Sequence, residues 1–307
     1  MEGIPSQDLE VQFNMDAKTS ASLKMAQLIE SAIKSFVRSS PLNRMPCDES
    51  QPVFDDPLVK FADGNDPLFA EFKTIIGPDH LTPMEALVKS YNKQPEDYGK
   101  LVSVISWVLP ITRKTRESNH EQTTIPSRYW AYTKYYGENF NNALRKHIVE
   151  MFTIRGYMTT APEIQPYFKI QTNEKGRFSN WSERHVAYVA GHGTFSLSDG
   201  FITEHGIAHR CGSVVIDLKL PPSPRTASTP FSNCLYYVNK SCTACITRCP
   251  AGAITEAGHN KIKCYAYLNF ILKQMPPDYQ GDTLNCGLCQ TGVPCEFKNP
   301  TKKPKEH

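Results

Sequence analysis

The segment that decides the fold of the C-terminal part is Cys242-Thr-Ala-Cys-Ile-Thr-Arg-Cys-Pro-Ala-Gly-Ala-Ile254. Its cysteines follow the spacing Cys-x2-Cys-x3-Cys-Pro, and a second run, Cys286-x2-Cys289-x5-Cys295, comes later in the chain. Cys234 and Cys264 each precede one run. Two-residue spacing lets neighbouring sulfurs point into one cavity, and Pro250 fixes the backbone as it leaves the first run. These eight late cysteines predict a thiolate-rich metal site.

Eight thiolates divide into two sets of four, which is the ligand count of two [4Fe-4S] clusters. In two-cluster ferredoxins the last cysteine of a run ligates the other cluster. We therefore predict one cluster held by Cys234, Cys242, Cys245 and Cys295, and a second held by Cys249, Cys264, Cys286 and Cys289.

Two alternatives remain open at the level of sequence. Asn239 stands three residues before Cys242, where a first ligand is usual, so Cys234 would replace it, or that cluster would hold three irons. Paired CxxC motifs also suit zinc, although the residues after Pro250, Ala251–Ile254, favour iron–sulfur clusters.

The composition excludes several classes of protein. The chain has 307 residues, 40% of them hydrophobic, and a formal net charge of +3, far from that of a protein that neutralises nucleic-acid phosphates. No apolar window is long enough to span a membrane, and the first twenty residues lack an export signal. Ten cysteines without an export signal indicate metal binding and a cytoplasmic protein.

Hydrophobic periodicity predicts an α+β fold. We predict helices over 22–37 and 128–155, an irregular segment over 41–67, and strands over 101–109, 186–189, 201–203 and 213–218. The proline-rich stretch over 221–230 indicates a domain boundary. The expected organisation is a polar N-terminal segment (1–20), an α+β cofactor- and substrate-binding domain (21–225), and a ferredoxin-like domain with two clusters and a basic tail (226–307).

The motifs together resemble the superfamily of epoxyqueuosine reductases and reductive dehalogenases. The resemblance rests on the run over 242–254, on Lys263–Leu268, on Cys286–Gln290, and on the glycine-rich stretch from Ala190 to Asp217. It implies a nitroreductase-like cobalamin-binding domain followed by a two-cluster ferredoxin-like module. The residues that it places against cobalamin are Gly191, His192, Gly193, Thr194, Phe195, Gly206, Gly212 and Ser213.

The resemblance also implies a proton donor. Epoxyqueuosine reductases have an aspartate where this chain has Thr159, so neither tRNA modification nor a tRNA partner is expected. Dehalogenases use a tyrosine supported by a cation, and a Tyr-rich segment supplies the candidates. These are Tyr129, Tyr132, Tyr135 and Tyr136, with Lys134 or Arg128 as the cation that lowers the tyrosine pKa.

Three functions follow from these observations. The first is a corrinoid-dependent reductase that passes electrons from two clusters to cobalamin and then to a small organic substrate. The second is an electron-transfer protein without a corrinoid, and the third is a reductase that uses a flavin or a cluster directly. In each case a reduced ferredoxin or flavodoxin is the expected electron donor.

Overall fold

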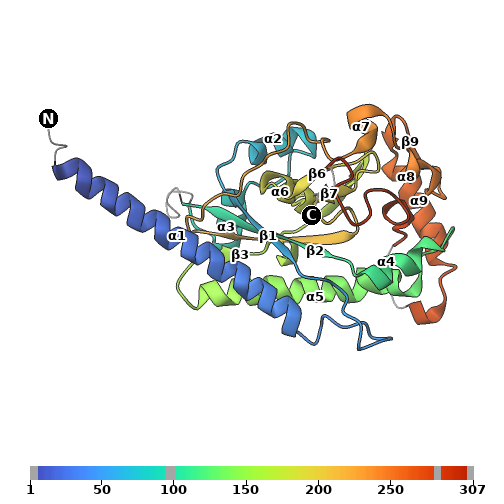
Figure 1. Cartoon of the computed structure of the whole chain (residues 1–307), viewed down its shortest axis with the longest axis horizontal. Helices are drawn as coiled ribbons and strands as arrows, with labels where there is room; N and C mark the ends of the chain where they lie inside the picture. The colour runs from blue at the N-terminus through green and yellow to red at the C-terminus, as the bar shows by residue number, and fades with distance from the viewer. Residues whose placement is uncertain (1–5, 95–100, 280–284, 303–307) are drawn as a thin grey trace.

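The computed structural model describes residues 6–94, 101–279 and 285–302, with side chains from Ser20 onward (Figure 1). A four-stranded antiparallel sheet with the strand order β1-β2-β8-β3 forms the centre. Its strands are β1 (Leu58–Asp63), β2 (Ser103–Pro110), β8 (His209–Ile216) and β3 (Thr159–Thr160). Among the described residues, no helix is both long and apolar enough to cross a membrane.

Strand β2 is buried along its whole length, as the apolar run over 101–109 predicts. Side chains of a strand alternate between its two faces. Ile105, Trp107 and Leu109 accordingly join one hydrophobic core, whereas Val104 joins a second core on the opposite face. The sheet is therefore covered on both sides.

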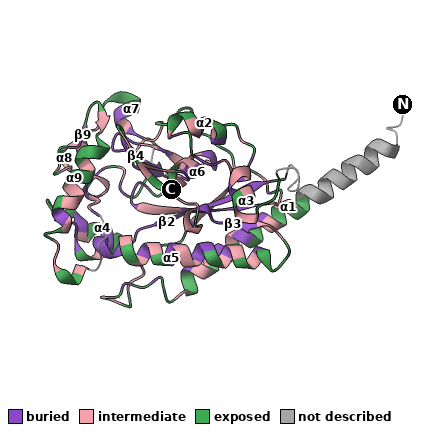
Figure 2. Ribbon diagram, turned by 180° about the vertical axis from the view of Figure 1, so that it is seen from behind, coloured by how far each residue is buried: buried purple, intermediate pink, exposed green. Residues whose placement is uncertain are grey.

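Two long helices cover the first face. Helix α5 (Arg128–Thr153) begins at Ser127, whose hydroxyl accepts a hydrogen bond from the Trp130 amide at 3.1 Å, and its buried stripe packs against the sheet (Figure 2). This helix confirms the prediction over 128–155. Helix α1 (Ser6–Ser39) packs on α5 through residues such as Ile29 and Ile33, and it begins well before the predicted start at residue 22.

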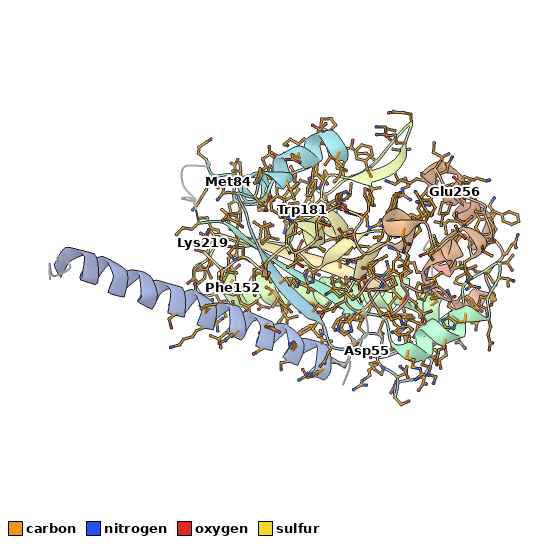
Figure 3. All side chains as sticks on the ribbon, turned by 45° about the horizontal axis from the view of Figure 1, so that its top comes forward. Asp55, Met84, Phe152, Trp181, Lys219 and Glu256 are labelled. Carbon is orange, nitrogen blue, oxygen red and sulfur yellow. The ribbon has the colours of Figure 1, made fainter. Side chains whose placement is uncertain are left out.

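Three shorter helices cover the second face: α2 (Leu68–Ile75), α3 (Pro83–Tyr91) and α6 (Glu183–Val189). Trp181 belongs to this core, whereas Phe152 belongs to the core on the other side of the sheet (Figure 3). The prediction of a strand over 186–189 is wrong, because this apolar segment is the last turn of α6. A short apolar run fits either element, and here it buries Val186 and Val189 from a helix.

The remaining elements form the end of the molecule that holds the cysteines (Figure 1). They are α4 (Arg113–His120), the hairpins β4–β5 (Ile170–Asn173, Gly176–Ser179), β6–β7 (Gly193–Phe195, Phe201–Thr203) and β9–β10 (Ile254–Thr255, Gly258–His259), and the helices α7 (Leu235–Asn239), α8 (Ala244–Thr247) and α9 (Lys261–Leu272). The strand predicted over 201–203 is confirmed as β7. Strand β1 lies inside the segment that was expected to be irregular.

Two buried or half-buried side chains join the cysteine segments to α4 within this end. Arg248 donates hydrogen bonds to carbonyls on both sides of it, those of Asn119 and Gln122 near α4 and those of Leu288 and Thr291 in the second cysteine segment. The buried Glu296 carboxylate pairs with Arg116 and His120 of α4. The C-terminal cysteine segments are therefore fixed against α4.

Candidate functional site

Four of the predicted ligands line one cavity. These are Cys234, Cys242, Cys245 and Cys295, and apolar side chains including Leu197, Ile202 and Val293 complete the wall. Burial raises the pKa of Cys295 to about 12 and that of Cys245 to about 11, and the neighbouring thiols raise both further. The structure thus gathers the first predicted set of four.

Cys234 reaches this cavity from the residue that precedes α7, and it is buried. Asn239, which occupies the usual position of a first ligand, is exposed, and its side chain accepts a hydrogen bond from the Ser241 amide at 3.1 Å. Cys234, and not Asn239, therefore faces the other three cysteines.

The second set of four also comes together. Burial raises the pKa of Cys286 to about 11, and Cys264 and Cys249 lie near enough to raise it further. Burial raises the pKa of Cys289 as well, and after burial the largest contributions come from Cys286, Cys264 and Cys249. The Ala253 amide donates a hydrogen bond to Cys249 Sγ at 3.3 Å. Cys264 is contributed by α9, and the other three by the two cysteine runs.

An all-thiol donor set arranged around a cavity fits a [4Fe-4S] cluster, whose four ligands each bind a different iron. Within the described ranges, no three side chains of His, Cys, Asp or Glu converge closely enough for a single metal ion. Cysteines of both sets pack against one small hydrophobic core that includes Ile202, Ile207 and Ile254. The two candidate clusters are therefore neighbours. Which metal these thiols bind stays a prediction.

Protein atoms fill the space beside the glycines that were predicted to approach cobalamin. A Cβ on Gly212 would lie 2.5 Å from Nε1 of Trp107, and one on Gly193 would lie 2.1 Å from the Ile202 carbonyl oxygen. At Gly191 and Gly206, both with positive φ, the nearest atoms would be the carbonyl oxygens of Pro224 and Glu296. Internal packing therefore explains each of these glycines without a cofactor.

The other four residues of that set make internal contacts too. His192 is buried and bonds the Ser106 carbonyl, whereas Thr194 accepts a hydrogen bond from the Asn233 amide at 2.8 Å. Ser213 is buried and donates to Glu183 at 2.7 Å, and Phe195 stacks among aromatic rings. These residues do not form an open surface for a corrin, and cobalamin stays a prediction from the resemblance alone.

The predicted pairing of a tyrosine with Lys134 differs from the structure. The charges nearest to Lys134 are those of Arg210, Glu138, Glu163 and Arg177, whereas Tyr136 lies with Tyr132, Tyr135 and Cys47. Burial raises the pKa of Tyr136, which is opposite to the expected lowering. Positions 134 and 136 lie about 200° apart around an α-helix, so they belong to different faces of α5.

Two further tyrosines of this segment have partners of their own. The Tyr129 hydroxyl donates to Asp48 at 3.3 Å. The Tyr132 hydroxyl donates to the Asp278 carbonyl at 2.6 Å and accepts from Arg128 at 3.1 Å, while Tyr135 is exposed. None of these contacts supplies a recessed acid.

The face of α5 that carries Lys134 belongs to a partly buried cluster of charged side chains, which we call the Arg145 pocket. Its centre is the fully buried Arg145, which pairs with three carboxylates from three elements: Glu138, Glu163 and Glu183. Arg210 and Cys211 of β8 complete it. Glu138 and Glu163 keep about a quarter of their side-chain surface exposed, although burial is the largest influence on the pKa of each. The pocket is therefore recessed and still reaches solvent.

Glu163 carries a proton near neutral pH. Burial raises its pKa to about 8 against the opposing charge of Arg145, and Glu183 and Glu138 raise it further. Glu183 therefore lies close to Glu163 and favours its protonated form. Sequence analysis missed Glu163, because its three partners are far apart in the chain and only the fold brings them together.

Arg177 links the Arg145 pocket to α9, the helix that carries Cys264. Arg177 of β5 acts on Lys134 and stacks on Tyr265, with 4.8 Å between its guanidinium carbon and the ring centroid. Tyr265 follows Cys264 in α9. The hairpin β4–β5 packs directly on α9, where a Cβ on Gly176 would approach Lys261. The β4–β5 hairpin therefore lies between the Arg145 pocket and the helix that carries Cys264.

Comparison with known proteins finds similar solved structures, and the matches described here are all epoxyqueuosine reductases. Neither a protein-family model nor a curated protein matches the chain. Similar solved structures include epoxyqueuosine reductase from Bacillus subtilis with its catalytic loop swung out of the active site (15% identity, TM-score 0.41) and a selenomethionine-labelled epoxyqueuosine reductase (17% identity, TM-score 0.42). Each covers 88% of this chain, which spans 66% of their length.

A third structure is that of epoxyqueuosine reductase with a tRNA-Tyr epoxyqueuosine-modified tRNA stem loop (17% identity, TM-score 0.43, covering 89% of this chain and 65% of that one). These neighbours carry the name of one of the two enzyme groups that the motifs resemble. The expectation that a tRNA partner is unlikely is contradicted by the RNA-bound neighbour, and we withdraw it.

Proposed function

We propose that this chain is an iron–sulfur oxidoreductase with two [4Fe-4S] clusters that reduces a substrate held at the Arg145 pocket. The observation that carries the proposal is the gathering of eight cysteines into two neighbouring sets of four, and Glu163 adds a recessed acid elsewhere on the same fold. Cys234, Cys242, Cys245 and Cys295 would hold one cluster, and Cys249, Cys264, Cys286 and Cys289 the other. When bound, the clusters supply single electrons at low potential.

The chain's own residues supply the proton. Glu163 would donate its proton to the substrate as the substrate gains electrons, and the resulting carboxylate would be stabilised by Arg145 and by the remaining hydrogen bonds of Glu183. Solvent then reprotonates Glu163 through its exposed edge. A two-electron reduction consumes two electrons from an external donor, such as a reduced ferredoxin or flavodoxin, and two protons.

The proposed reaction does not include cobalamin, because protein atoms fill the space beside the glycines that were expected to approach it. The visible spectrum of the anaerobically reconstituted protein with added hydroxocobalamin tests this choice directly. A corrinoid band that co-purifies with the protein would restore the corrinoid-dependent reductase.

The experiment for the function follows cluster oxidation. The reconstituted protein is reduced with dithionite under anaerobic conditions, freed of excess reductant, and mixed with an aryl halide, an aliphatic epoxide or bulk tRNA. We expect one of these to reoxidise the clusters and to yield a reduced product. If only redox dyes reoxidise them, the chain is an electron-transfer protein and the reductase proposal fails.

A further inference from the structure

Two cations of the Arg145 pocket form no ion pair with a carboxylate of the described residues. All three carboxylates in the pocket pair with Arg145, and none pairs with Lys134 of α5 or Arg210 of β8. The Arg210 Nε atom is buried and has no hydrogen-bond partner among the described residues. A buried donor without an acceptor is costly, so the Arg210 guanidinium is poised for an acceptor that the protein does not supply.

The surroundings keep these two cations close together. The pKa of Lys134 is lowered first by the charge of Arg210 and then by burial, while burial lowers the pKa of Arg210 itself. Two like charges in a recessed position repel each other, and an anion between them relieves that repulsion. Arg177 from β5 adds to the positive field.

Glu138 and Glu163 act on Arg210 from a distance, whereas its neighbours along β8, His209 and Cys211, are uncharged. Burial lowers the pKa of His209 to about 4, so its ring is neutral at pH 7, and its Nε2 donates to the Phe201 carbonyl at 2.7 Å. Its Nδ1 can then accept from the Cys211 thiol, whose sulfur lies 3.6 Å away. Burial raises the pKa of that thiol, which is neutral as well.

We infer that Lys134 and Arg210 bind an oxyanion, a phosphate or carboxylate group carried by the substrate. Guanidinium presents two parallel donors that match both groups, and Lys134 adds a point charge from the opposite wall. This inference names the substrate class for the proposed reductase and in that sense rests on the proposed function. It places the anionic group next to Glu163, which lies close enough to both cations to act on their pKa values.

The test uses inorganic phosphate and acetate as probes of the reconstituted protein. Binding is followed by the ³¹P line of phosphate and the ¹³C line of labelled acetate, with chloride holding the ionic strength constant. We expect saturable binding to the wild-type protein, at least tenfold weaker binding to K134Q and R210Q, and partial recovery in R210K. The exposed Lys146 on the same helix provides the matched control K146Q, which should bind like the wild type.

The outcomes distinguish a phosphate ligand from a carboxylate ligand. They also distinguish failure of the anion site from failure of the proposed reductase function. Binding of phosphate alone assigns a phosphorylated substrate, and binding of both probes shows that a carboxylate suffices. No saturable binding of either probe, or equal binding by K134Q and the wild type, overturns the inference. If R210Q does not fold, K134Q decides, because Lys134 is partly exposed. The titration needs no turnover, so its failure is distinguishable from failure of the reductase proposal.

Discussion

Cys234 reaches the first cavity from a position that the usual cysteine spacing does not use. Substituting Cys234→Ser removes one of four thiols from that cavity and leaves the second set intact. We expect the iron content to fall from about eight to about seven or four per chain, with the signal of a three-iron cluster or the loss of one cluster. Electron paramagnetic resonance with iron analysis measures both.

The control for this change is Cys47→Ser. Cys47 packs against the main hydrophobic core and lines neither set of thiols, so its substitution should leave iron and spectrum unchanged. An unchanged iron content in the Cys234→Ser protein would show that Cys234 is not a ligand.

Glu163 gives stability a distinct pH dependence. Its pKa in the folded protein, about 8, lies above the ordinary value of 4.5, so the folded state holds the proton more tightly. Between these two pH values the folded state binds more protons than the unfolded state, and stability therefore falls as pH rises. The groups facing Glu163 are Arg145, Glu138 and Lys134 of α5, Glu183 of α6, and Arg210 and Cys211 of β8.

Substituting Glu163→Gln keeps the shape of the side chain and removes the titration. Between pH 5 and pH 8 the wild type should lose on the order of 2 kcal/mol more unfolding free energy than E163Q, allowing for the exposed quarter of the side chain. Urea denaturation at each pH measures this, with the exposed Glu150→Gln as control. Parallel pH profiles for wild type and E163Q would contradict a protonated Glu163.

At the scale of elements, Arg248 joins α8, α4 and the second cysteine segment through carbonyl hydrogen bonds. Arg248→Met keeps much of the side-chain volume and removes the guanidinium donor from those carbonyls, so we expect a loss of about 2 kcal/mol in unfolding free energy. Arg113→Met removes an arginine on α4 whose side chain is 81% exposed and should change stability by less than about 0.5 kcal/mol. Equal unfolding free energies of the two variants, measured in urea, would show that Arg248 does not hold these segments together.

Some elements could be predicted from sequence and others could not, for physical reasons. Strand β2 and helix α5 are long enough for their apolar patterns to be unambiguous. The segment over 186–189 is too short, and its β-branched valines favoured a strand although it completes α6. Strand β1 was hidden among prolines and aspartates, and its pairing with β2 is a long-range contact.

The candidate site also has parts that the sequence predicts and parts that it does not. The cysteine sets follow from spacing, because neighbouring ligands are near in sequence. The Arg145 pocket draws on α5, α6, β8 and the segment after β3, so no local pattern indicates it. The glycines pointed to a cofactor, but in the structure they make room for Trp107 and for neighbouring backbone.

In the whole molecule, the sheet and its helices carry the Arg145 pocket, and the cysteine segments are fixed to α4. The proposed reduction of a substrate requires that the thiols of these segments hold a redox-active metal. The proposed organisation into a domain over 21–225 and a ferredoxin-like domain over 226–307 remains a prediction.

The most direct test of the account is the metal and sulfide content of the anaerobically reconstituted protein. Two [4Fe-4S] clusters predict about eight iron and about eight acid-labile sulfide per chain, with both signals lost when the cysteines of both sets are replaced. Stoichiometric zinc without sulfide, held by the same cysteines, would contradict the assignment of two [4Fe-4S] clusters.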